Sequence, residues 1–157
     1  LEEALARGLR PILSGRSAAV RALAAVHGLE ARIASLDDTS AMQSALSGIK
    51  VVLHCAGPFK HTSAPMLRAC LDAGAHYLDI TGEIEVFERV AAMDEAARAN
   101  GITLLPGVGF DVVPSDCLAA HLKERMPEAT ELTLAFRYMK SFSNIVAEEG
   151  IIIRVTP

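Results

Sequence analysis

The chain has 157 residues, a length that suits one domain together with the beginning of another. Its net charge is −4 and its Lys and Arg residues form no long run, which argues against a nucleic-acid-binding surface. The apolar stretches are far shorter than the ~18 residues that would span a bilayer, so we expect no integral membrane segment in this chain.

Composition also constrains the core and the cysteine chemistry. Hydrophobic residues make up 51% of the chain but aromatic residues only 4%, so Ala, Val, Leu and Ile must build the core. The three cysteines, Cys55, Cys70 and Cys117, form no CxxC pair, and the histidines are not spaced around them as zinc ligands would be. We therefore expect reduced thiols, a cytoplasmic protein and no metal site.

Helices and strands are predicted to alternate along most of the chain. Short apolar runs predict five strands, at 9–14, 30–35, 50–55, 76–80 and 102–105. Helical spacing of apolar residues and helix-capping residues predict helices at 1–7, 17–28, 39–48, from 62 or 63 onwards, 86–100 and from 114 onwards. In the fourth of these helices we place Pro65 in the first turn, where a missing N–H costs nothing.

The last predicted strand differs from the others. Apolar and polar residues alternate from 132 to 138, which is typical of a strand with one covered face. By contrast, the strand at 50–55 carries a run of Val, Val and Leu, typical of a parallel strand buried on both faces. We therefore predict a first domain at 1–125 and the beginning of a second at 126–157.

This alternation predicts an α/β fold, with a Rossmann-type open parallel sheet and helices as crossovers. No glycine-rich loop precedes the strand at 9–14, so we expect the chain to lack the first strand of such a sheet. Ligands bind such sheets at the carboxyl ends of the strands, and the residues that follow each strand are therefore the candidate site.

The residues after the first strand indicate the cofactor. Gly15, Arg16 and Ser17 occupy the place where an Asp or Glu would bind the ribose 2′-hydroxyl of NAD. An Arg there favours the 2′-phosphate of NADP, because a guanidinium pairs with phosphate oxygens through two hydrogen bonds. The alternative is a surface turn with a solvated Arg. We favour NADP.

Polar or small residues also follow the other strands. Asp37 is a candidate to accept a hydrogen bond from the adenine amino group, whereas Asp38 is expected to cap the next helix. The third strand ends in Cys55, Ala56, Gly57, Pro58 and Phe59, where small residues let the backbone approach a ligand closely. The fourth and fifth strands are followed by Asp79, Thr81, Gly82 and Glu83, and by Phe110 and Asp111.

Taken in order, these stretches resemble the saccharopine dehydrogenase-like oxidoreductases, including the trans-acting enoyl reductases. The matching segments are Gly-Arg-Ser at 15–17, Ala-Gly-Pro-Phe at 56–59, Tyr-Leu-Asp-Ile-Thr-Gly-Glu at 77–83 and Gly-Val-Gly-Phe-Asp-Val-Val-Pro-Ser-Asp at 107–116. The resemblance covers roughly residues 1–138. The tail from 140 to 157 lacks the Gly-, Ser- and Thr-rich stretch that the family would show there.

The resemblance implies an NADP-binding Rossmann domain, an α+β substrate domain and hydride transfer to or from a C=C or C=N bond of a small-molecule substrate. It places Arg16 at the adenosine phosphate and residues 55–59 beside the nicotinamide half. It places residues 79–83 and 110–116 on the substrate side. It implies no particular catalytic acid or base, because family members use different substrates.

Other functions remain open at this point. The chain is alternatively an inactive fragment, or a nucleotide-binding or interaction module without catalysis. A short-chain dehydrogenase is disfavoured because neither Tyr77 nor Tyr138 has a Lys four residues on. The oligomeric state is not set, and a homodimer is one alternative.

Overall fold

The computed structural model describes residues 1–110, 112–142 and 145–155, which fold as two compact units. The first unit spans Leu1–Gly109 and the second begins at Phe110. The elements of the first unit are α1 (Glu2–Ala6), β1 (Leu13–Gly15), α2 (Ala19–Val26), β2 (Ala31–Ile33), α3 (Thr39–Leu46), β3 (Val51–His54), α4 (Phe59–Ala73), β4 (His76–Asp79), α5 (Ile84–Ala91), α6 (Asp94–Ala99) and β5 (Leu104–Leu105).

The five predicted strands are present, and each strand pairing among them is parallel. They are shorter than predicted, and they form two sheets instead of the expected one: β1 pairs with β2, and β3, β4 and β5 follow in that order. The two sheets stay separate because no described strand pairs with both β1 and β3. In the doubly wound order the first strand lies between them.

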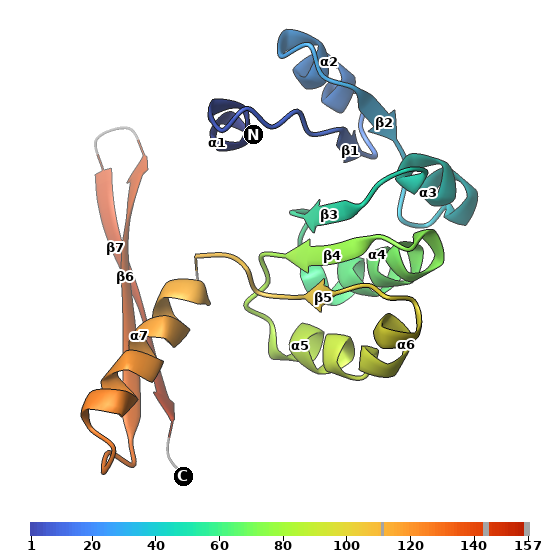
Figure 1. Ribbon diagram of the computed structural model, residues 1–157. Coiled ribbons are helices and arrows are strands. Elements are labelled where there is room, and N and C mark those ends of the chain that lie inside the picture. Colours follow the sequence, from blue (N-terminus) through green and yellow to red (C-terminus); the bar gives the residue numbers. More distant parts are fainter. Residues whose placement is uncertain (111, 143–144, 156–157) are drawn as a thin grey trace. The chain divides into compact units, whose positions relative to one another are not determined.

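The core of the first unit lies between helices and one face of the three-stranded sheet. Helix α4 packs against β3, β4 and α5 (Figure 1). On this face Tyr77 and Asp79 of β4 are completely buried. On the opposite face Val51 is 53% exposed and Leu53 is 59% exposed, so that face has no comparable cover within the described residues.

Helix α4 begins earlier than its sequence predicts. The expected start was Thr62 or Ser63, with Pro65 in the first turn, but the helix begins at Phe59 and Pro65 lies inside it. The extra turn is stabilised by Glu83, whose carboxylate accepts hydrogen bonds from the first amides of the helix. This partner is more than twenty residues away in the chain, so local patterns gave no sign of it.

The helix predicted at 86–100 is divided into α5 and α6. The two helices are separated at Ala92 and Met93, although Val86, Val90 and Ala97 still lie on one buried face, as predicted. The chain therefore keeps the expected buried apolar residues on both sides of the break between the two helices.

The second unit consists of α7 (Val113–Arg125) and an antiparallel pair, β6 (Leu132–Phe142) and β7 (Ile145–Val155). The alternating stretch at 132–138 is thus a strand, as predicted, whereas β7 was not predicted. Helix α7 belongs to the same compact unit as these strands. The predicted domain boundary at 125/126 stays a prediction. Among the described residues, no helix is long and apolar enough to cross a membrane.

Candidate functional site at the strand ends

Asp79 organises the carboxyl ends of β4 and β5. Its side chain is fully buried, and Oδ2 accepts a hydrogen bond from the Tyr77 hydroxyl at 2.6 Å. Oδ1 accepts from the backbone N–H of Thr81 at 3.0 Å and of Gly107 at 2.9 Å. Burial and this hydrogen bond raise the pKa of the Tyr77 phenol, so Tyr77 remains a donor to the carboxylate.

Thr81 and Glu83 extend this arrangement to β3. The buried Thr81 hydroxyl accepts from the backbone N–H of Glu83 at 3.0 Å. The Glu83 carboxylate then accepts from the N–H of Phe59 through Oε1 at 2.9 Å and of Lys60 through Oε2 at 2.6 Å. We call Asp79, Thr81 and Glu83 the strand-end clamp, because they join the loops that follow β3, β4 and β5.

The loop after β3 is held from a second side by His54. This buried side chain lies 3.0 Å from the Thr62 hydroxyl, and that hydroxyl donates to the carbonyl of Ala56 at 2.6 Å. Phe59 meets the His54 ring edge-on, with ring centroids 5.5 Å apart. Burial lowers the pKa of His54, although the charge of Asp79 opposes the shift, which favours a neutral ring.

The loop itself presents backbone and small side chains to solvent. Cys55, Ala56, Gly57 and Pro58 are exposed, and the Gly57–Pro58 peptide bond is cis. Phe59 is partly buried at the start of α4. A fixed, exposed loop without bulky side chains is suited to close approach by a flat ligand.

The turn after β5 fits tightly against the turn after β4. Gly107 has a φ of +72°, and a Cβ at this position would lie 2.6 Å from Cζ of Phe87. At Gly109 a Cβ would lie 2.9 Å from Cβ of Ile80. A side chain at either position would therefore force a neighbouring residue to move.

The predicted phosphate-binding residues lie at the end of the other sheet. Gly15 closes β1, and Arg16 and Ser17 follow it with exposed side chains. The Ser17 hydroxyl accepts from the N–H of Ala19 at 3.2 Å, at the start of α2. Among the described residues, the Arg16 guanidinium has no hydrogen-bond or ion-pair partner, so it is available to an anion.

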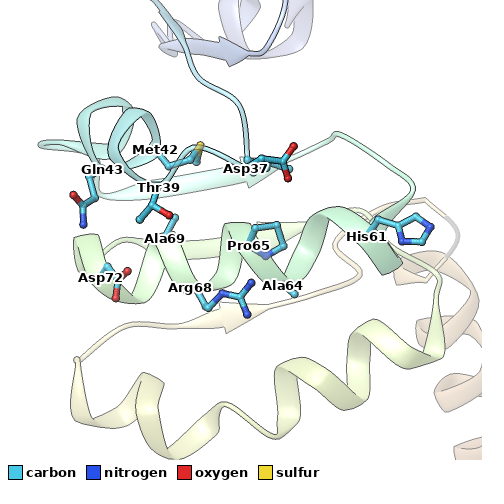
Figure 2. Close-up of a pocket in the computed structure, with 11 residues that line it drawn as sticks. Asp37, Thr39, Met42, Gln43, His61, Ala64, Pro65, Arg68, Ala69 and Asp72 are labelled. Carbon is cyan, nitrogen blue, oxygen red and sulfur yellow. The ribbon is translucent and has the colours of Figure 1, made fainter.

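The two aspartates after β2 have different roles. Asp38 caps α3, as predicted: it accepts from Ala41 N–H at 2.9 Å and from the Ser40 hydroxyl at 2.8 Å, and mainly the first bond lowers its pKa. Asp37 is exposed and lines a cavity of about 520 Å³ between α3 and α4 (Figure 2). Both walls carry polar side chains, Thr39 and Gln43 on α3 and Arg68 and Asp72 on α4, next to apolar ones such as Met42 and Pro65.

The structure thus brings together two of the predicted groups, residues 55–59 and 79–83. It does not join Gly15–Ser17 to them in one sheet. Gly82 is exposed beside the clamp, and Phe110 is exposed at the beginning of the second unit, while Asp111 lies outside the described residues. In the described part of the chain, no three His, Cys, Asp or Glu side chains gather where they could hold a metal ion.

The sequence predicted no role in the site for His54, Thr62, Tyr77 and Gly107, although Tyr77 and Gly107 lie in the segments that resemble the family. His54 directly precedes a predicted site loop and Tyr77 lies two residues before Asp79, on the same face of a strand. That alternation was the available signal for Tyr77. Thr62 gave no signal, because its role depends on where α4 begins.

Comparison with known proteins identifies the fold and the family. Residues 10–105 match the family described as "Saccharopine dehydrogenase NADP binding domain". The chain belongs to this family of NADP-binding domains. The apo saccharopine dehydrogenase (L-Glu forming) of Saccharomyces cerevisiae has the same fold over 82% of this chain and 29% of its own, with a TM-score of 0.67 and 16% identity.

Curated relatives agree with this assignment. A probable mitochondrial saccharopine dehydrogenase-like oxidoreductase of Arabidopsis thaliana is 34% identical over 84 residues, which cover 53% of this chain and 18% of that protein. A trans-acting enoyl reductase of Mycobacterium leprae is 30% identical over 143 residues, covering 85% of this chain and 34% of that protein. The chain therefore spans only about a fifth to a third of the length of these two relatives.

Proposed function

We propose that the protein is an NADP-dependent oxidoreductase that transfers a hydride to or from a C=C or C=N bond of a small molecule. Membership of the NADP-binding family supports the cofactor, and the names of the relatives support oxidoreductase chemistry. The type of bond is suggested by the names of two relatives, a trans-acting enoyl reductase and a saccharopine dehydrogenase-like oxidoreductase.

One observation carries the proposal: the exposed Arg16 and Ser17 directly after β1. An acidic residue at this position would repel a 2′-phosphate, whereas a guanidinium and a hydroxyl can both donate hydrogen bonds to it. Asp37, which lines the cavity in Figure 2, is a candidate acceptor for the adenine amino group.

The loop at 55–59 is proposed to border the nicotinamide half. Bound NADP(H) supplies or accepts the hydride. This chain's residues would orient the ring: the loop is fixed by His54 and by Glu83, and its small side chains leave room for the ring to approach.

Oxidation of NADPH by the protein, in the form its cell makes, tests this proposal. Candidate acceptors are α,β-unsaturated thioesters for a C=C bond, and a 2-oxo acid mixed with an amine for a C=N bond. We expect one class to accelerate the loss of absorbance at 340 nm. Binding of NADPH without turnover of either class would contradict the proposed reaction but not the cofactor assignment.

We also propose that residues 1–157 alone do not catalyse turnover. Within the described residues β1 pairs only with β2, and β3 only with β4, so each has an edge without a hydrogen-bonded neighbour. The side chains of Val51 and Leu53 are also more than half exposed on β3. Burying each large apolar side chain contributes roughly 1.5–3 kcal/mol, so these open positions weaken the sheet that carries the site. Turnover by the isolated 157 residues would contradict this proposal.

A further inference from the structure

The Glu83 side chain, a candidate for the substrate side, accepts hydrogen bonds from the first turn of helix α4. Its two carboxylate oxygens accept from two successive amides, those of Phe59 at 2.9 Å and Lys60 at 2.6 Å. These are the first two residues of the fifteen-residue helix α4, whose N-cap, Pro58, has no side chain that can accept a hydrogen bond. First-turn amides have no acceptor within their own helix, so Glu83 provides the acceptor that the sequence around Pro58 lacks.

We propose that Glu83 is a positioning residue for the loop at 55–59 and, through it, for the nicotinamide half of NADP(H). This inference rests on the proposed function, and it differs from the expectation that Glu83 contacts the substrate. The carboxylate is committed to α4, where the partial positive charge of the helix N-terminus also favours it. Glu83 thereby fixes the residue, Phe59, at which the exposed loop ends.

The position of Glu83 is itself fixed from the core. Its N–H donates to Thr81, and the Thr81 N–H donates to the buried Asp79. The β5 turn joins the same carboxylate through Gly107. The loop after β3 is consequently held in register with the loops after β4 and β5, which the family resemblance places on the substrate side.

The Glu83 carboxylate also limits which ligands the N-terminus of α4 can bind. Because both oxygens engage the first two amides, this helix N-terminus is not free to bind a cofactor phosphate. The exposed side chains of Arg16 and Ser17 after β1 remain the candidate donors to a cofactor phosphate.

Substitution of Glu83 by Gln tests the positioning role. Gln keeps one acceptor oxygen but places an NH₂ donor against one of the two amide donors. Glu85→Gln is the matched control, because this substitution makes the same change in charge. Glu85 is exposed and lies in the first turn of α5. Glu83→Asp retains the charge and serves as the conservative variant if the Gln variant does not fold.

The first measurement is residue-resolved hydrogen exchange of the Phe59 and Lys60 amides, which requires no cofactor. We expect protection to fall about tenfold or more in Glu83→Gln, in line with the loss of a hydrogen bond to a charged group, and to be partly retained in Glu83→Asp. Glu85→Gln should leave it unchanged. Unchanged protection in Glu83→Gln would overturn the proposal.

The second measurement compares NADPH with 2′,5′-ADP, which has the phosphorylated adenosine half but no nicotinamide. We expect Glu83→Gln to raise the Kd of NADPH about tenfold and to leave the Kd of 2′,5′-ADP within about twofold. Equal weakening of both would indicate general destabilisation and overturn the positioning role. If the wild-type protein binds neither nucleotide, the proposed function fails, and the exchange result alone decides whether Glu83 fixes the loop.

Discussion

At the scale of single residues, the buried carboxylate of Asp79 is a candidate site residue that also stabilises the loops around the site. Its oxygens accept from Tyr77, Thr81 and Gly107, and the side chain is fully buried. A buried acceptor that collects several donors is costly to replace, because each donor would be left without a partner in the protein interior. The sequence-based assignment of Asp79 to the substrate side stays a prediction.

We expect Asp79→Asn to lower the free energy of unfolding by about 1.5–3 kcal/mol, the range for a hydrogen bond to a charged group. The Asn side chain retains one acceptor oxygen and turns a donor toward groups that themselves donate. Urea denaturation measures the effect. Asp72→Asn on the exposed side of α4 is the control and should change stability by less than about 0.5 kcal/mol. A loss for Asp79→Asn no larger than the control would show that the network contributes little.

His54 gives the first unit a dependence on pH. Burial lowers its pKa, so the unfolded chain takes up a proton near the ordinary value of about 6.5 while the folded chain takes it up only at lower pH. Between those two pKa values the unfolded state binds more protons, so the free energy of unfolding rises with pH. This part of the stability is complete above pH 6.5 and is lost as the pH falls.

The corresponding test measures stability from pH 7.5 down to 5 in three proteins. The wild type should lose stability below about pH 6.5. His54→Gln should lose much of that slope, whereas His61→Gln, at an exposed position in α4, should retain it. An unchanged slope in His54→Gln would assign the pH dependence to other groups.

At the scale of elements, the sequence predicted those whose signals are local. The strand β3 follows from its run of Val, Val and Leu. Asp38 was recognised as a cap because the groups that donate hydrogen bonds to its carboxylate lie within three residues. The start of α4 was wrong because it depends on Glu83, more than twenty residues away. The division into α5 and α6 was missed because the apolar stripe runs through both.

The turn after β5 is an element whose geometry can be tested by substitution. Gly107 and Gly48 have similar φ values, +72° and +74°. A Cβ at Gly107 would meet Phe87 at 2.6 Å, whereas a Cβ at Gly48 would lie in open space. We expect Gly48→Ala to cost about 1–2 kcal/mol for the left-handed backbone. Gly107→Ala should cost a further 1–3 kcal/mol, roughly, because Phe87 must move.

Chemical denaturation of the two glycine variants provides the comparison. Gly48→Ala, at the end of α3, reports backbone strain alone, and the difference between the variants reports the contact with Phe87. Equal losses would mean that the Phe87 ring moves away without cost.

At the scale of the whole molecule, the fold class could be predicted because it rests on a pattern repeated along the chain, whereas the family was indicated by the resemblance of particular segments, such as those at 56–59 and 77–83. Polar and small residues recur after each apolar strand, and the structure confirms parallel pairing in the two sheets that carry them. The prediction of a single sheet was wrong: the strands form two sheets, because continuity depends on a strand between β1 and β3, which local signals do not report. The relation of Arg16 to the loop at 55–59 therefore remains part of the proposed function.

The most direct measurement is a calorimetric titration of NADPH and of NADH into the protein as its cell makes it, with Arg16→Ala alongside the wild type. The wild type should bind NADPH more tightly than NADH, because the exposed guanidinium after β1 pairs with the 2′-phosphate. Arg16→Ala should weaken NADPH by about 1.5–3 kcal/mol and leave NADH nearly unchanged. Equal affinities of the wild type for the two cofactors, or equal losses for both in Arg16→Ala, would contradict the assignment of the β1 end as the NADP phosphate site.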